Sequence, residues 1–210
     1  SCICENPERV KSSPVCGVTS LSDVSLITVQ GSGMIGVVGI TSRLFSCISQ
    51  KKVSVMLITQ GSSEHSITFA VTPADSKVAK KLIEKEFKLE MKDGLIEPLN
   101  VEENLSIITV VGEDMKNTPG ISARLFDALG RNGISAVATA QGASELNISV
   151  VISKEHEKKA LNSVHETFFL SEIKTLNVFS FFLSKSTISN SFLFEALRVL
   201  LYFTTLLSKK

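Results

Sequence analysis

The feature that most constrains this chain is a block of residues that occurs twice. Residues 24–87 align with residues 105–168 at a constant offset of 81 and without a gap. About 20 of the 64 aligned positions are identical, which is far more than chance gives for an ungapped pairing. A duplication of this length predicts two copies of one supersecondary unit, which can bury their faces against each other and form paired sites at the seam between them.

Hydrophobic periodicity predicts the same order of elements, β-α-β-β-α, in both copies. In the first copy the predicted elements are a strand at Val24–Val29, a helix at about Val38–Gln50, strands at Val53–Thr59 and His65–Val71, and a helix from Pro73 through Phe87. In the second copy they are a strand at Leu105–Val111, a helix at Ile121–Asn132, strands at Ile134–Ala140 and Glu145–Ile152, and a helix at Lys154–Phe168.

The order β-α-β-β-α lacks the fourth strand that a ferredoxin-like βαββαβ unit needs. Only two segments could supply it, Leu95–Val101 and Lys174–Phe179. We therefore expect an α+β fold of two ferredoxin-like units that share strands across the repeat and do not form independent domains.

Composition excludes several classes of function. The net charge is +1 and no basic block is present, so a nucleic-acid surface is not expected. The apolar segment Phe192–Leu207 is shorter than the roughly 20 residues of a spanning helix and contains Glu195 and Arg198, so we expect no membrane insertion. This segment is interpreted as a disordered or opportunistically helical tail, with an amphipathic docking helix as the alternative.

The four cysteines do not form a disulfide framework, which favours a reducing, cytoplasmic compartment. Cys2 and Cys4 form a C-x-C pair, but no second pair of metal-binding residues stands at ligand spacing, so no metal site is expected. His65, His156 and His165 lie outside any nucleophile motif. No catalytic residue is therefore predicted.

A glycine-rich loop after the first strand matches G-x-G-x-x-G at Gly31, Gly33 and Gly36. By itself this motif suggests a dinucleotide site. The second copy reads GEDMKNTPG at the same place, and the second strand ends in Thr59 and Gln60 where an acidic residue would be needed. We therefore expect no nucleotide cofactor.

The residues that both copies keep indicate a different chemistry. Gly39 and Gly120 stand where a helix begins, and a glycine there lets the helix N–H groups approach a bound carboxylate. Gln60 and Gln141 end the second strand of each copy, and a glutamine amide can read an ammonium or a hydroxyl group. These residues predict a small polar pocket in each copy. The alternative is that the glutamine and the glycine after it only form a β-turn.

At these residues the sequence resembles the ACT domain pair of aspartokinases, over residues 17–179. The segments that carry the resemblance are VSLITVQGSGMIGVVGITSRLF, LITQGSSEHSITF, GEDMKNTPGISARLFDALGRNGIS and AQGASELNISVVI. Their sequences are most similar to those of bifunctional aspartokinase–homoserine dehydrogenases. The resemblance implies ferredoxin-like modules that bind a free amino acid, with the second unit inserted into the first. It also implies association into a homodimer or higher oligomer, attached to an aspartokinase catalytic domain in the parent protein.

The resemblance further implies a threonine sensor for feedback inhibition. The family's threonine-binding glutamines fall on Gln60 and Gln141, and loop residues near 34–39 and 115–120 would line the same pockets. The predicted effector-binding set is Gln60, Gln141, Met34, Ile35, Gly39, Met115 and Gly120.

The predicted domains are a linker or kinase remnant at 1–20, a first ACT unit at 21–100, a second at 101–179 and a divergent tail at 180–210. No ATP motif precedes the repeat, and after Phe179 the resemblance to the dehydrogenase stops, which is interpreted as a truncated or frameshifted reading of a bifunctional gene. The alternatives to an amino-acid sensor are a dimerisation scaffold without ligands, and an enzyme with the parent's aspartate kinase or homoserine dehydrogenase activity, which these residues are not expected to support.

Overall fold

The computed structural model describes residues 14–61, 65–113, 115–144 and 146–170. The predicted strand at Lys174–Phe179 and the apolar tail lie outside these residues. The elements are β1 (Gly17–Gln30), α1 (Ile40–Ser49), β2 (Leu57–Gln60), β3 (Ser66–Val71), α2 (Pro73–Glu86), α3 (Lys88–Lys92), β4 (Asn100–Val111), α4 (Ile121–Arg131), β5 (Ala138–Gln141), β6 (Asn147–Ser153) and α5 (Glu157–His165), with short 3-10 or π turns at 32–34, 154–156 and 166–170.

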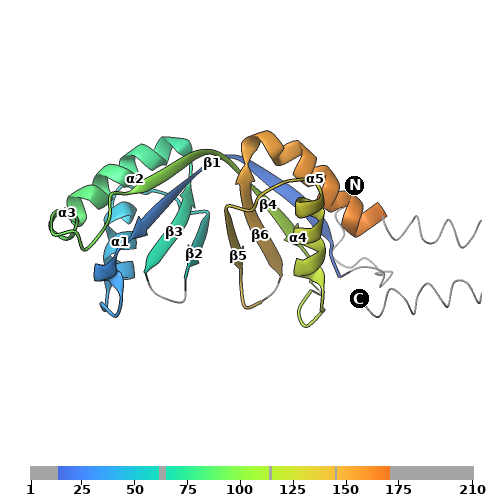
Figure 1. The fold of residues 1–210 in the computed structure, drawn as a ribbon, viewed down its shortest axis with the longest axis horizontal. Coiled ribbons are helices and arrows are strands. Elements are labelled where there is room, and N and C mark those ends of the chain that lie inside the picture. Colours follow the sequence, from blue (N-terminus) through green and yellow to red (C-terminus); the bar gives the residue numbers. More distant parts are fainter. Residues whose placement is uncertain (1–13, 62–64, 114, 145, 171–210) are drawn as a thin grey trace, which may run out of the picture. The chain divides into compact units, whose positions relative to one another are not determined.

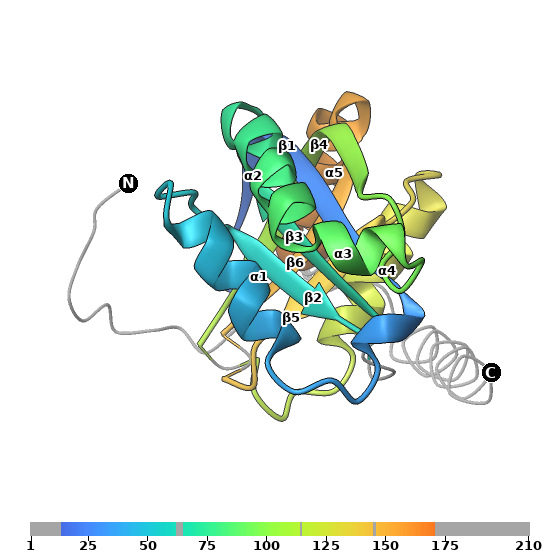
Figure 2. The same ribbon diagram turned by 90° about the vertical axis from the view of Figure 1, so that its left-hand side faces the viewer.

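The six strands form one antiparallel sheet in the order β2-β3-β1-β4-β6-β5. The α+β fold of two ferredoxin-like units is therefore confirmed. Helices α1 and α2 cover the first half of the sheet, and α4 and α5 cover the second (Figures 1 and 2). The edge strands β2 and β5 carry the two glutamines at their ends.

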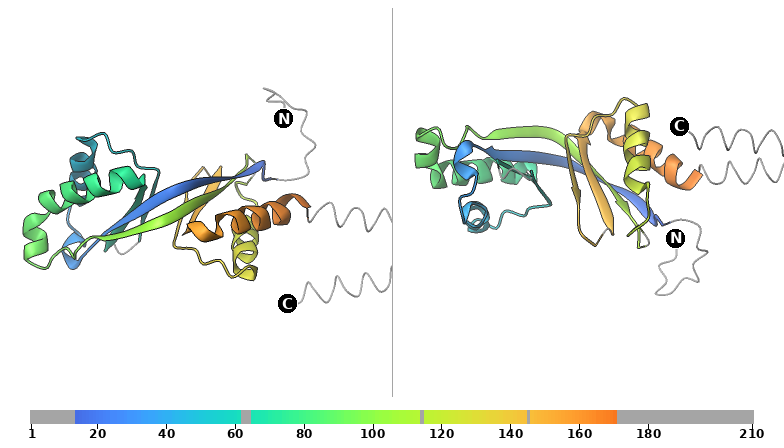
Figure 3. Two further views of the ribbon diagram at one scale, coloured as in Figure 1. Left: turned by 90° about the horizontal axis from the view of Figure 1, so that it is seen from above. Right: turned by 60° about the horizontal axis from the view of Figure 1, so that its bottom comes forward.

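The two central strands are long because each belongs to both units. The first part of β1, Gly17–Leu21, pairs with the last part of β4, Ile107–Val111. The last part of β1, Leu26–Thr28, pairs with the first part of β4, Asn100–Glu102. Figure 3 shows the two strands side by side along their length. Strand sharing across the repeat is therefore confirmed, and it supplies the fourth strand of each unit.

This pairing differs from the sequence expectations in two places. Residues 17–20, expected in a linker, form the start of β1, because their backbone groups pair with β4. The second unit is consequently completed by residues that precede the first unit. Within the described residues it is the first unit that lies inside the second, the reverse of the insertion that the resemblance implied.

A local backbone feature marks the point where each long strand passes from one unit to the other. Asp23 and Asn104 are 81 residues apart, and both have a left-handed backbone, with φ of 59° and 58°. The pairing of β1 with β4 shifts register at the same place. Short polar side chains tolerate this conformation better than branched ones. The kink therefore occurs symmetrically in the two strands.

Alternation along the strands places apolar side chains in hydrophobic cores on both faces of the sheet. On the helix side of the first half, Ile27, Phe69 and Leu44 are fully buried in one cluster with residues of α2. On the opposite face, a second cluster joins the two halves of the sheet and contains Val24, Leu26, Leu57, Ala70, Leu105, Ile107 and Val151. Side chains of successive strand residues point to opposite faces, so one strand serves both cores.

Several element boundaries differ from the predictions. The second strands are shorter than expected, Leu57–Gln60 in place of 53–59 and Ala138–Gln141 in place of 134–140. Val53 and Ile134 are nevertheless buried, so an apolar side chain at these positions indicated core packing and not strand pairing. The predicted helix at 154–168 is an α-helix only at Glu157–His165, with other helical turns on both sides.

Candidate functional site

Each unit has a cavity between the end of its second strand, the loop after its first strand and the beginning of its first helix. The cavity of the first unit has a volume of about 300 Å³ and is lined by Met34, Gly36, Val37, Val38, Gly39, Ile40, Thr41, Gln60 and Ile67. The cavity of the second unit has a volume of about 190 Å³ and is lined by Met115, Thr118, Gly120, Ile121, Ser122, Ala123, Gln141 and Ile148. We call these the first pocket and the second pocket.

The two pockets occupy corresponding places in the repeat. Seven of the eight residues that line the second pocket lie 81 positions after a residue that lines the first. Both volumes are at or below the lower limit of about 300 Å³ for pockets that hold drug-sized ligands. The pockets therefore suit a molecule of amino-acid size.

The helix that opens onto each pocket has N–H groups that no side chain caps. Gly39 precedes α1 and Gly120 precedes α4, and neither helix has a side-chain capping hydrogen bond. By contrast, α2 is capped by Thr72, whose hydroxyl oxygen accepts from the Asp75 N–H at 3.2 Å. The first N–H groups of a helix favour an anionic group, because the helix dipole is positive at this end. A carboxylate is thus the group that fits this side of each pocket.

The glycines at these helix starts are required by backbone conformation. Gly39 has φ of 92° and Gly120 has φ of 90°, values that residues with a side chain rarely adopt. Steric crowding does not explain the glycines, because an added β-carbon would meet nothing within 4 Å at either position. The positive φ turns the chain into the helix beside the pocket.

The glutamines close the opposite side of the pockets. Gln60 is the last residue of β2 and pairs with Ile67, and Gln141 is the last residue of β5 and pairs with Ile148. Both members of each pair line the pocket. A glutamine amide offers a carbonyl acceptor and two N–H donors, so it can bind an ammonium group and a hydroxyl group.

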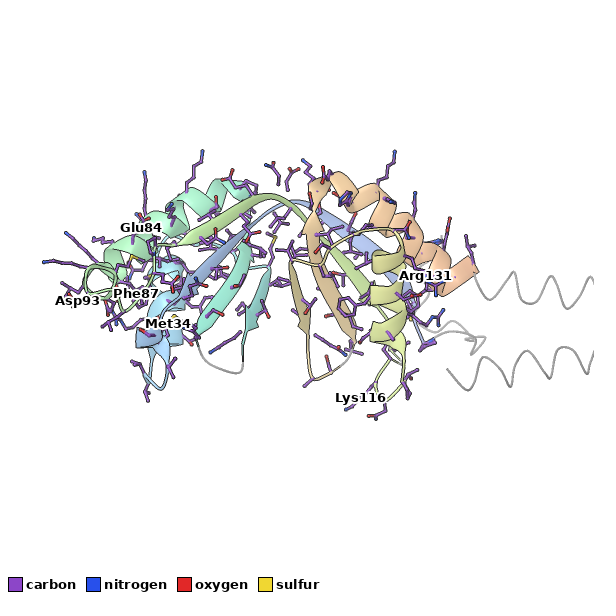
Figure 4. All side chains as sticks on the ribbon, viewed as in Figure 1. Met34, Glu84, Phe87, Asp93, Lys116 and Arg131 are labelled. Carbon is purple, nitrogen blue, oxygen red and sulfur yellow. The ribbon has the colours of Figure 1, made fainter. Side chains whose placement is uncertain are left out.

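Six of the seven predicted effector-binding residues lie in the pocket linings: Gln60, Gln141, Met34, Gly39, Met115 and Gly120. The exception is Ile35, which does not line the first pocket and whose exposed fraction is 55%. The side chain before it, Met34, is 3% exposed (Figure 4). The turn at 32–34 directs one of these neighbours inward and the other outward.

Sequence reasoning missed other pocket residues, notably Thr41, Ile67, Ser122 and Ile148. A signal for some of them was present. Ile67 and Ile148 are identical in the two copies, and Thr41 aligns with Ser122, so a hydroxyl group stands early in both helices.

The glycine-rich loop does not form the turn of a dinucleotide site. Gly31 packs against the backbone of residues 95 and 96, where an added β-carbon would lie 2.2 Å from the Leu95 carbonyl oxygen. Gly36 has φ of 67°, and the corresponding Asn117 has φ of 58°. The glycines therefore serve close backbone packing and a left-handed turn, and α1 begins only at Ile40.

In each unit, an arginine of the first helix contacts a phenylalanine at the end of the second helix. The guanidinium group of Arg43 lies over the Phe87 ring at 4.6 Å, and that of Arg124 over the Phe168 ring at 4.6 Å. Arg43 also donates hydrogen bonds to two glutamates, and its hydrogen bond to Glu90 raises the pKa of Arg43 and lowers that of Glu90. The pocket helix is thus held by contacts outside the pocket.

No group of three or more His, Cys, Asp or Glu side chains in the described part of the chain is arranged to hold a metal ion. None of its helices combines the length and the apolar character needed to cross a bilayer.

Comparison with known proteins identifies relatives of the whole arrangement. The ACT domain family matches residues 27–87 and residues 108–168, two segments that are again 81 positions apart. The bifunctional aspartokinase/homoserine dehydrogenase of Haemophilus influenzae is 44% identical over 161 residues, which are 77% of this chain and 20% of that protein. The chloroplastic bifunctional aspartokinase/homoserine dehydrogenase 2 of Arabidopsis thaliana is 39% identical over 173 residues, 80% of this chain and 19% of that protein. The chain thus spans about a fifth of the length of these curated relatives.

Among solved structures, the ligand-free regulatory subunit of aspartate kinase from Thermus thermophilus is similar to this chain with a TM-score of 0.63 and 25% identity. The match covers 73% of this chain and 99% of the Thermus subunit. The similarity therefore includes both units and the sheet that joins them.

Proposed function

The chain belongs to the ACT domain family, and from this membership we propose that it is the regulatory region of an aspartokinase, which binds a free amino acid in each of its two pockets. The observation that carries the proposal is the pair of equivalent cavities, each with uncapped helix N–H groups on one side and a glutamine amide on the other. The similarity to an aspartate kinase regulatory subunit over nearly its whole length supports the same conclusion.

L-threonine is the effector that we propose. Its carboxylate would accept from the first N–H groups of α1 or α4. Its ammonium group would donate to the amide oxygen of Gln60 or Gln141. Among the described residues that line the two pockets, none is Asp, Glu, Lys or Arg. A side chain without charge, such as that of threonine, is consistent with this lining.

Regulation would follow from a shift between two packings of the units. If threonine binds one packing better, it increases the population of that packing and changes the activity of an attached aspartokinase catalytic domain. In this proposal the chain itself supplies the sensor, and the chemistry belongs to the parent protein.

The test is titration calorimetry of the chain with L-threonine, L-lysine, L-methionine and L-homoserine. We expect heat with threonine, and a loss of one set of sites in each of the variants Gln60→Ala and Gln141→Ala. Truncating a side chain that binds a charged group costs about 1.5 to 3 kcal/mol, or about 10- to 150-fold in Kd. A folded sample that gives no heat with any of the four amino acids would refute the proposal.

A dimerisation scaffold is the second candidate, and one observation favours it. The loop beside the first pocket exposes Ile35, Val37 and Val38, with exposed fractions of 55%, 50% and 100%. Adjacent exposed apolar side chains are typical of an interaction surface. Sedimentation velocity with and without threonine separates the two candidates: a scaffold gives a dimer that is independent of the ligand and no heat on titration.

A further inference from the structure

The two pockets have the same backbone frame. The loop of each pocket contains the same turn, in which the Val37 N–H donates to the Met34 carbonyl at 3.3 Å and the Thr118 N–H donates to the Met115 carbonyl at 3.1 Å. The residue before each donor has a left-handed conformation in both loops. Val37 and Thr118 therefore occupy the same position, one in each pocket, and both line it.

The two pockets differ in the chemistry of this position and in size. Valine and threonine have nearly the same shape, but one presents a methyl group where the other presents a hydroxyl. The first pocket is also larger, about 300 Å³ against about 190 Å³, and the neighbouring Val38 adds apolar surface to its lining. Most of the remaining lining is shared: a methionine, a glycine, a glutamine and two isoleucines stand at corresponding positions.

The difference has a direct consequence for ligands that differ in the same way, namely L-threonine and its isostere L-valine. An apolar wall discriminates only weakly between two ligands of equal shape, whereas a site that hydrogen-bonds a ligand hydroxyl rejects the analogue without it. A threonine hydroxyl can both donate and accept, so the Thr118 side chain can bind a ligand hydroxyl beside any other contact that it makes.

We propose that the two pockets have different ligand preferences: the second selects a small amino acid with a side-chain hydroxyl, the first also accepts its apolar isostere, and the pair Val37 and Thr118 sets the difference. This inference rests on the proposed function, because it names the ligand preference of the pockets in which that function resides. It makes the second pocket the one that identifies threonine.

The experiment measures each pocket alone in the full chain. Gln60→Ala leaves the second pocket intact, and Gln141→Ala leaves the first. In each background the Kd for L-threonine and for L-valine is measured by calorimetry. We expect the preference for threonine over valine to be about tenfold larger in the second pocket, the effect of about one hydrogen bond.

Reciprocal exchanges test the assigned position. Thr118→Val in the Gln60→Ala background should reduce the preference for threonine by about 3- to 10-fold, and Val37→Thr in the Gln141→Ala background should raise it by a similar factor. Thr118→Ser, which keeps the hydroxyl, is the matched control and should leave the preference unchanged. Thermal unfolding of every variant confirms that it is folded.

The outcomes separate this inference from the proposed function. Equal preferences in the two pockets, or a first pocket that rejects valine, would overturn the inference while threonine binding persists. A change of preference with Thr118→Ser as large as with Thr118→Val would overturn the role of the hydroxyl. Absence of heat with threonine in the unsubstituted chain would overturn both.

Discussion

Replacing Gly112 by alanine should destabilise the protein strongly, although alanine is usually tolerated where a glycine has an ordinary backbone conformation. Gly112 follows β4 directly, is buried, and does not have a positive φ. A β-carbon built on it would lie 2.1 Å from the Pro14 carbonyl oxygen and 2.8 Å from the Met115 side chain. The methionine side chain can move, but the Pro14 oxygen belongs to the backbone that leads into β1.

The size of the expected loss of stability follows from the backbone that the new β-carbon would displace. Ordinary contacts of a β-carbon are 3.4 Å or longer, so the backbone at Pro14 and Gly112 must separate by more than 1 Å. Two hydrogen bonds hold the same place, from the Cys16 N–H to the Val111 carbonyl at 2.7 Å and from the Gly112 N–H to the Leu146 carbonyl at 3.0 Å. Each contributes about 1 kcal/mol net, and overpacking costs about 1 to 3 kcal/mol. We expect a loss of about 2 to 4 kcal/mol in the free energy of unfolding.

The assay is thermal unfolding followed by circular dichroism, with Gly130→Ala as the matched control. Gly130 lies in α4, and an added β-carbon there would meet nothing within 4 Å, so alanine should stabilise the helix by about 0.5 to 1 kcal/mol. Gly112→Ala should lower the Tm by about 5 to 15 °C and Gly130→Ala should raise it slightly. A Gly112→Ala variant with an unchanged Tm would refute the steric argument.

Three further predictions concern other parts of the fold. Arg43→Ala should lower the free energy of unfolding by about 1 to 2 kcal/mol in urea denaturation, because it removes the stacking on Phe87 and two ion pairs, and Arg43→Lys should lose less. Glu157 accepts a hydrogen bond from Ser106 at 2.7 Å, and this bond lowers the pKa of Glu157 in the folded state. The ionised carboxylate therefore stabilises the fold above the unfolded pKa, and this stabilisation is lost as the pH falls through the lower folded pKa. Below a pH of about 4.5, the stability of Glu157→Gln should consequently fall less steeply with pH than that of the unsubstituted protein. Deletion of residues 1–21 should reduce hydrogen-exchange protection in the second half of β4 while protection in β3 persists, because only the former loses a pairing strand.

The duplication in the sequence predicted most of the fold and the site. The two copies gave the order of elements, and the residues kept in both, Gly39 with Gly120 and Gln60 with Gln141, proved to line the pockets. These residues are recognisable because a φ near 90° strongly favours glycine, and because a glutamine amide offers both a donor and an acceptor. The same comparison demoted the G-x-G-x-x-G loop, whose glycines serve packing and a turn.

The fourth strands were predicted only in part: the candidate Leu95–Val101 overlaps the start of β4 at Asn100 and Val101, whereas residues 17–20 were expected in a linker. Pro14 and Leu95, which are 81 positions apart, play the same role in the structure, but they share no side-chain property. Both pack against a glycine through the backbone carbonyl, and the strands that follow them pair through backbone groups. Backbone pairing constrains the identity of the side chain only weakly, so the repeat continues in the structure beyond the point at which it fades from the sequence.

Strand exchange also determines how the two pockets are connected. β1 begins three residues after Pro14, whose carbonyl packs on Gly112, and it ends at Gln30, directly before Gly31. β4 runs the opposite way: it follows the Leu95 carbonyl that packs on Gly31, and it ends directly before Gly112. Each pocket loop therefore starts at the end of one long strand and rests on the chain that enters the other. If binding at one pocket affects the other, the hydrogen-bonded backbone of β1 and β4 is the connection that the structure provides between them.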